Sequence, residues 1–142
     1  MTIAAILEKK GREVVSIAAD ASVGEAVALL AERRIGAVPV VTAGAVVGML
    51  SERDVIYKLH EGGAGILDWK VGRVMTAPAI TADPSMLAFV ALSQMTRRRI
   101  RHLPVVEGGR LTGIVSIGDL VAFRIQRIEE EVEAMRGYIQ GT

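Results

Sequence analysis

The chain has 142 residues, of which 51% are hydrophobic and 23% are charged, so it can bury one ordinary domain core. Its 17 Lys and Arg residues balance 16 Asp and Glu residues, and the net charge of +1 gives no overall attraction to nucleic acid or to an anionic membrane. With no cysteine and only two histidines, His60 and His102, the sequence excludes a disulfide framework and a thiolate or histidine-rich metal site, and we expect a cytoplasmic protein.

The N-terminal stretch MTIAAILEKKGREVV has neither a basic leader nor an uninterrupted apolar segment, so it predicts no signal peptide. A helix is expected next, and Ser22 with Glu25 forms the capping-box pattern at its start. The apolar residues of this helix recur at the spacing of one helix face: Val23, Ala26, Val27 and Leu30.

Two short apolar runs follow, Ala37–Val41 and Val46–Leu50, with turn residues around Gly44 between them. The whole stretch Gly36–Leu50 is too short to cross a bilayer as a helix, so it predicts buried strands. The segment His60–Trp69 carries three glycines and predicts a linker, with Trp69 docked where the two parts of the chain meet.

The same order of elements returns further along the chain. Asp83 and Pro84 predict the start of a second helix, with Asp83 as the N-cap. Two more apolar runs follow, Leu103–Val106 and Leu111–Val115, around a turn at Gly108 and Gly109. The apolar face of the second helix repeats that of the first: Ala88, Ala91, Leu92 and Met95.

The chain is therefore an internal duplication with an offset of 65 residues. RRIGAVPVV at Arg33–Val41 aligns with RRIRHLPVV at Arg98–Val106, and GMLSERD at Gly48–Asp54 aligns with GIVSIGD at Gly113–Asp119. The pattern predicts an α/β fold of two β-α-β-β-α units packed with pseudo-two-fold symmetry.

The last helix extends beyond the duplicated part of the chain. Its apolar residues step by four and three, which indicates a seam that packs against a partner helix, either of the same chain or of another: Val121, Ile125, Ile128, Val132, Met135 and Ile139.

Two hypotheses explain the repeated motif. Ser51 with Asp54, and Ser116 with Asp119, have the spacing of capping boxes. Each motif also marks the junction of a strand and a helix, where a hydroxyl, free amides and a carboxylate suit a polyol such as ribose.

These doubled motifs resemble a tandem pair of CBS domains, named after cystathionine β-synthase and often called a Bateman module, over roughly Val14 to Ile128. The resemblance implies a first repeat with the N-terminal helix at 1–62, a linker at 63–74 and a second repeat with the extended helix at 75–142. It also implies an adenine nucleotide (AMP, ADP, ATP or NAD) or S-adenosyl methionine between the repeats, and a homodimer that acts on an unknown effector protein.

By the same resemblance, Asp54 and Asp119 contact ribose hydroxyls, and Ser51 and Ser116 contact ribose or phosphate. Arg101 and His102 match phosphate-binding positions, whereas the first repeat has Gly36 and Ala37 there. We therefore expect a phosphate-binding cleft at Arg101, His102, Ser116 and Asp119, and a second cleft at Ser51 and Asp54. Weaker candidates are Arg53, Lys58, Gly36, Ala37, Thr81, Leu103 and Pro104.

The tract RRRIRH at Arg97–His102 has three interpretations: a solvated helix end, a site for nucleotide phosphates, or contact with nucleic acid. Balanced charge and 4% aromatic residues disfavour nucleic acid. For the whole chain we expect a regulatory nucleotide-binding module without catalytic residues or a catalytic cofactor. The alternatives are a scaffold with empty clefts and an enzyme acting on a nucleotide, but no activated nucleophile or phosphate-loop motif supports the enzyme.

Overall fold

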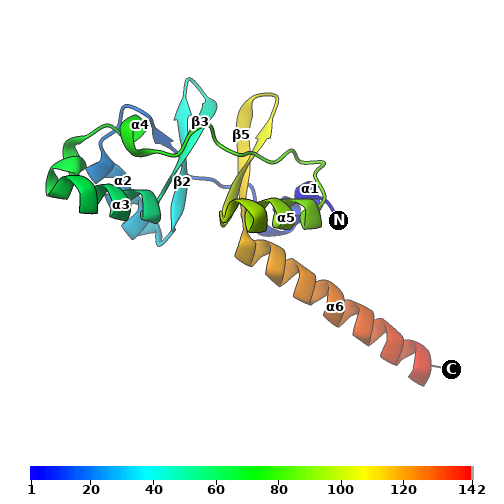
Figure 1. Ribbon diagram of the computed structural model, residues 1–142. Coiled ribbons are helices and arrows are strands. Elements are labelled where there is room, and N and C mark those ends of the chain that lie inside the picture. The colour runs from blue at the N-terminus through cyan, green and yellow to red at the C-terminus, as the bar shows by residue number, and fades with distance from the viewer. Residues whose placement is uncertain (142) are drawn as a thin grey trace.

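Two small β-sheets stand side by side in the centre of the molecule, and helices flank them, as the computed structural model of residues 1–141 shows (Figure 1). The first unit consists of β1 (Ile17–Ala18), α2 (Val23–Arg33), β2 (Ala37–Thr42), β3 (Ala45–Ser51) and α3 (Glu52–Gly62). The second unit consists of α5 (Ala88–Arg98), β4 (His102–Glu107), β5 (Arg110–Ser116) and α6 (Ile117–Gln140). The predicted α/β class is confirmed.

The duplication extends to the hydrogen-bonding register of the sheets. β2 and β3 are antiparallel with Ala37 opposite Ser51, and β4 and β5 are antiparallel with His102 opposite Ser116. Both hairpins have a register shift at the same place, between Val40 and Val41 and between the equivalent Val105 and Val106. β1 adds to β2 in parallel, whereas its counterpart in the second unit is a single bridge from Ala82 to Val105.

The first helix of each unit shows where local sequence decides the structure and where it does not. The predicted capping box at α2 is confirmed, because Ser22 and Glu25 exchange backbone-to-side-chain hydrogen bonds. The predicted start of α5 at Asp83 and Pro84 is wrong, since α5 begins at Ala88 and the Asp83 carboxylate accepts hydrogen bonds from Ser85 instead.

The later start of α5 is caused by tertiary hydrogen bonds. Residues 84–88 exchange backbone hydrogen bonds with the N-terminal residues of the chain: the amide of Ile3 donates to Met86 and the amide of Ala88 donates to Met1 (both 2.8 Å). These bonds, together with a turn in which the Met86 amide donates to the carbonyl oxygen of Asp83 (2.9 Å), satisfy the backbone groups without a helix.

The N-terminal helix α1 (Ile3–Lys10) packs in the core of the second unit, although sequence analysis grouped it with the first repeat. Ile3 and Leu7 are completely buried there, against side chains that include Met95, Leu103 and Val115. The chain therefore begins in the second unit with α1, forms the first unit next, and then returns to complete the second unit.

The glycine-rich segment predicted as a linker is instead part of the first core. It forms a 3₁₀ helix, η1 (Gly63–Asp68), followed by the short helix α4 (Val71–Val74). Ile66, Val71 and Val74 are buried, and Trp69 packs against the same core as an aromatic anchor. The chain crosses between the units at residues 75–87. No helix within residues 1–141 is long and apolar enough to span a membrane.

The glycine of each repeated motif lies where another segment crosses the sheet closely. A Cβ atom on Gly48 would lie 2.6 Å from Sδ of Met75 and 2.8 Å from the carbonyl oxygen of Thr76. This segment is also held to β3 by two backbone hydrogen bonds between Met49 and Thr76. On Gly113 a Cβ atom would meet the end of the Leu7 side chain at 2.9 Å.

We expect Gly48→Ala to lower the free energy of unfolding by about 1–3 kcal/mol, because a backbone carbonyl must move to admit the methyl group. Gly65→Ala is the matched control, since no atom lies within 4 Å of the place that a Cβ atom on Gly65 would take, and it should change stability by less than about 0.5 kcal/mol. Urea denaturation measures both. Equal effects would show that the crossing segment does not constrain Gly48.

Candidate functional site

Both Ser-x-x-Asp motifs form capping boxes, which confirms the capping hypothesis. The Asp54 amide donates to Oγ of Ser51 (3.2 Å), and the Ser51 amide donates to Oδ2 of Asp54 (2.9 Å). Ser116 and Asp119 repeat these bonds at 3.0 and 2.8 Å. Capping fixes each carboxylate at the start of its helix.

The two aspartates differ in their further partners. Oδ1 of Asp54 accepts a hydrogen bond from the hydroxyl of Thr76 (2.9 Å), a neutral partner on the segment that crosses β3. Oδ2 of Asp119 accepts from Nζ of Lys10 (2.6 Å), and the same ammonium group donates to the carbonyl oxygen of Ile114 (2.7 Å). Lys10 is the last residue of α1, so the chain's own N-terminal helix places a cation on the second motif.

The ion pair with Lys10 stabilises the ionised form of Asp119. Partial burial would raise the pKa of this carboxyl group, but hydrogen bonds from Lys10 and Ser116, together with the Lys10 charge, outweigh burial and lower the pKa below 3.8. Asp119 is therefore ionised and neutralised by Lys10 at physiological pH.

A cavity of about 760 Å³ lies between the two units, and we call it the Asp54 cleft. One side is formed by the end of β3 and the start of α3, with Ser51 and Asp54. The opposite side is formed by the end of α5 and the start of β4. Its lining there includes Arg98, Arg99, Ile100, Arg101 and His102.

This arrangement differs from the grouping expected from sequence, which placed Arg101 and His102 with Ser116 and Asp119. His102 is opposite Ser116 in the β4–β5 register, so the two are neighbours in the backbone. The two sheets, however, contact each other through β3 and β5. The start of β4 lies at this interface, where it lines the cleft together with residues of the first unit. The structure therefore brings Arg101 and His102 together with Ser51 and Asp54.

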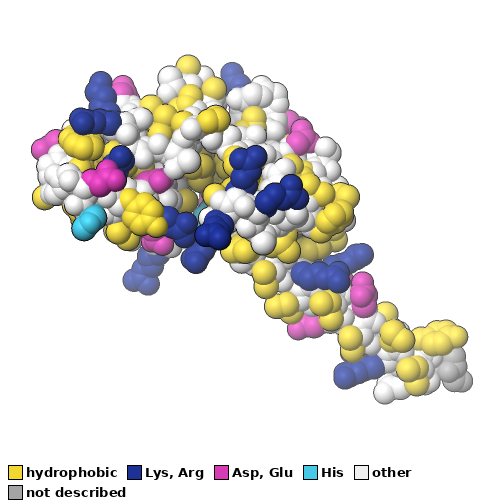
Figure 2. All heavy atoms as spheres, viewed as in Figure 1, with side chains coloured by type: hydrophobic (Ala, Val, Ile, Leu, Met, Phe, Trp, Pro, Cys, Tyr) yellow, Lys and Arg dark blue, Asp and Glu magenta, His cyan; other side chains and the backbone are white. Residues whose placement is uncertain are grey.

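The cleft combines positive charge with an apolar floor. Arg53 joins the arginines of the opposite side, and Figure 2 shows Lys and Arg side chains gathered where the two units meet. Apolar groups of the cleft come from the crossing segment, residues 75–87, with Pro78, Ala79 and Ile80, and from the first unit, with Met49 and Ile56. Desolvation by burial lowers the pKa of His102, and the Lys10 and Arg101 charges lower it further against the opposing effects of Asp119 and Glu52. His102 is therefore neutral at pH 7 without a bound anion.

The weaker candidates fall into two groups. Gly36, Ala37 and Arg53 line the cleft. The others do not: Lys58 pairs with Glu61 at 3.2 Å, Thr81 is exposed, and Leu103 and Pro104 are buried. Sequence analysis missed Lys10 and Thr76, because only the tertiary fold brings them to the motif aspartates.

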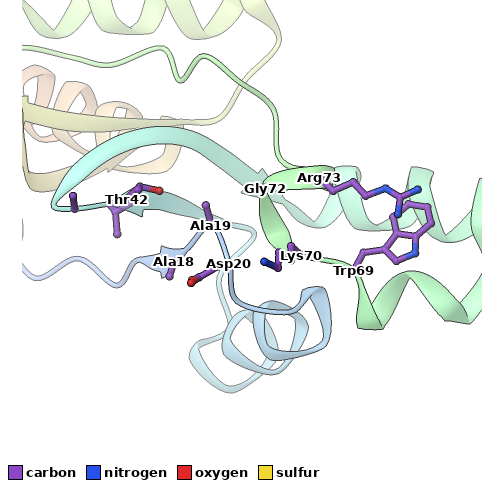
Figure 3. A pocket seen from close by; sticks show the side chains of 10 residues that line it. Ala18, Ala19, Asp20, Thr42, Trp69, Lys70, Gly72 and Arg73 are labelled. Carbon is purple, nitrogen blue, oxygen red and sulfur yellow. The ribbon is translucent and has the colours of Figure 1, made fainter.

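A second hollow, of about 890 Å³, lies at the outer edge of the first unit (Figure 3). Its walls are small side chains such as Ala18 and Ala19, with the guanidinium of Arg73 stacked 3.6 Å from the centre of the Trp69 ring. None of its lining residues belongs to a Ser-x-x-Asp motif or to the second unit. The Asp54 cleft is the better site because it joins both units and combines a carboxylate with several cations.

Comparison with known proteins agrees with this architecture. The CBS domain family model matches residues 10–61 and 71–125. A mitochondrial CBS domain-containing protein of Arabidopsis thaliana is 34% identical over 149 residues, which cover 99% of this chain and 72% of the relative.

Two solved structures extend the comparison. A CBS-domain containing protein of Agrobacterium tumefaciens is 39% identical with a TM-score of 0.83, over 87% of this chain and 99% of that one. A CBS domain protein of Pyrobaculum aerophilum, complexed with AMP, is 28% identical with a TM-score of 0.75, over 84% and 89% of the two chains.

We expect Lys10→Met to lower the free energy of unfolding by up to about 1 kcal/mol at pH 7, because it removes the ammonium group from ionised Asp119. Since the pKa of Asp119 is lowered in the folded state, this stabilisation is present above the ordinary value of 3.8 and is lost as the pH falls through the lowered value.

Urea denaturation at pH 7 and pH 3 tests this, with Lys9→Met as the control in the same helical turn. Within residues 1–141 Lys9 has no ion pair, so its substitution should have little effect at either pH. A Lys10→Met effect of the same size at both pH values would contradict the role of the ion pair.

Proposed function

Because the chain belongs to the CBS domain family, we propose that it is a regulatory module that binds an adenine nucleotide in the Asp54 cleft. One observation carries the proposal: the cleft places the Asp54 carboxylate of one unit opposite the arginines of the other. A ligand that needs both groups contacts both units at once.

The chemistry of the cleft suits the parts of a nucleotide. Asp54 is an acceptor for ribose hydroxyls, and Ser51 is a donor or acceptor beside it. Arg98, Arg101 and His102 are donors for phosphate oxygens. The apolar crossing segment offers a surface for the base. The Pyrobaculum aerophilum protein, whose structure contains AMP, supports this class of ligand.

The second motif is the weaker candidate for ligand binding. Ser116 and Asp119 have the same local geometry as Ser51 and Asp54, but Lys10 already neutralises Asp119. At Asp119 the Lys10 ammonium group compensates the carboxylate charge through a charge-assisted hydrogen bond of 2.6 Å, whereas the further partner of Asp54 is the neutral Thr76 hydroxyl, so Asp54 is the stronger acceptor for a ribose hydroxyl. We therefore propose one preferred site per chain.

The proposed regulation follows from the thermodynamic linkage between nucleotide binding and the arrangement of the two units. A nucleotide that bridges the units can shift their relative arrangement only if it binds one arrangement better than another. We propose that this shift is the signal and that the chain performs no catalysis. Incubation with ATP followed by product analysis tests the second point, because any nucleotide turnover would contradict it.

Three further parts of the proposal rest on composition and on family resemblance. They are a cytoplasmic location, a homodimer and an effector protein that responds to the bound state. The location is open to direct test by fractionation of cells, since the plant relative is named as a mitochondrial protein.

We expect Asp54→Asn to weaken nucleotide binding by about tenfold or more, since it removes a charged acceptor from the ribose site. The Asn oxygen can still accept from the Ser51 amide, so thermal stability should change little. Asp119→Asn is the matched control and should change nucleotide affinity by less than about twofold, because the Asp119 carboxylate is paired with Lys10 and does not line the Asp54 cleft. Calorimetric titrations with AMP, ATP and NAD measure all three proteins. If no nucleotide binds the unsubstituted protein, the two Ser-x-x-Asp motifs serve only as helix caps, and the chain is a scaffold protein with empty clefts.

Arg101→Gln should weaken AMP binding by about tenfold and leave adenosine binding unchanged, because only AMP carries a phosphate for the guanidinium group. Arg97→Gln provides a control from the same arginine tract. Arg97 does not line the cleft and donates instead to Oγ of Ser93 (3.3 Å), so its substitution should affect neither ligand. Equal losses for AMP and adenosine in Arg101→Gln would contradict a phosphate contact.

A further inference from the structure

Helix α6 presents a stripe of exposed apolar side chains, and we call it the α6 seam. Its first five residues have exposed fractions between 45% and 66%. Leu120 and Phe123, on another face of the helix, provide its contacts with the second core. Figure 2 shows hydrophobic side chains along the projecting helix. The α6 seam consists of Val121, Ile125, Ile128, Val132, Met135 and Ile139.

The outer half of α6 is exposed, and its start, at Arg127 and Glu130, lines a hollow shared with α1. Every residue from 127 to 140 is exposed, and the helix projects away from both sheets (Figure 1). A helical segment of this length is marginally stable in water by itself, and most helices gain their stability by packing an apolar face. The α6 seam is therefore a surface for another helix.

We propose that the α6 seam pairs with the α6 seam of a second copy of this chain, parallel and in register. In heptad terms, Ile125, Val132 and Ile139 occupy the a positions and Val121, Ile128 and Met135 the d positions. β-Branched residues at the a positions are typical of parallel coiled coils, and the number of helices is then set by the other core positions, here Val121, Ile128 and Met135.

Charges beside the seam select this orientation. In a parallel pair, Arg124 lies next to Glu129 of the second copy, and Glu131 lies next to Arg136 of the second copy. Symmetry repeats both contacts, so all four flanking pairs are of opposite charge. An antiparallel pair with the full seam overlapped instead brings Glu131 against Glu131 of the second copy, which is repulsive.

Cysteine trapping tests the register directly, because the chain contains no cysteine of its own. In the proposed pair the two residues at position 132 face each other, so Val132→Cys should form a disulfide-linked dimer in oxidised glutathione. Glu133→Cys, one position along and outside the seam, should stay unlinked. Cross-linking of Val132→Cys mainly to Ile128→Cys in a mixture of the two would show an antiparallel pair and overturn the proposal.

Charge reversal gives a second test in the full chain without oxidation. Arg124→Glu and Glu129→Arg should each weaken the dimer by about tenfold in sedimentation equilibrium, because each creates two like-charge contacts per dimer. The double variant, or an equimolar mixture of the two single variants, should restore association. A monomer at all concentrations in the unsubstituted protein would overturn the proposal, as would a dimer that neither single substitution weakens.

Discussion

The second unit depends on side chains from the far end of the chain. Ile3, Ile6 and Leu7 of α1 complete the core beneath β4 and β5, and Leu7 packs directly on Gly113 of the repeated motif. The same helix ends at Lys10, so the burial of its apolar face determines where that ammonium group lies. A packing requirement in the core thereby sets the electrostatics of one of the two motifs.

Duplication gave two identical capping boxes, and tertiary context made them different. Asp54 meets a hydroxyl from the crossing segment, whereas Asp119 meets a cation from α1. Arg101 and His102 have no basic counterparts in the first repeat, which has Gly36 and Ala37 at the equivalent positions. Divergence at a few positions outside the motif is thus sufficient to give the two Ser-x-x-Asp motifs of a symmetric fold different electrostatic surroundings.

The sequence predicted most of the fold because local periodicity and repetition carry it. The four strands of the two hairpins, the apolar faces of α2 and α5, and the Ser22 cap follow from spacing alone. The errors at Asp83 and in the glycine-rich segment arose where backbone pairing with the N-terminus, or burial of Ile66, outweighed local preference. The site residues Ser51, Asp54, Arg101 and His102 were identifiable as motifs. Their assembly into one cleft was not, because it depends on how the two sheets meet.

The length of α6 also determines how far a small movement is carried. Its 24 residues extend over about 36 Å, and its first turn is anchored beside β5 by Leu120 and the Ser116 cap. A rotation of about 10° at that anchor displaces the tip by about 6 Å, on the order of one helical turn. A rotation at the unit interface too small to alter the core therefore displaces the far end of α6 much more than it displaces the anchor.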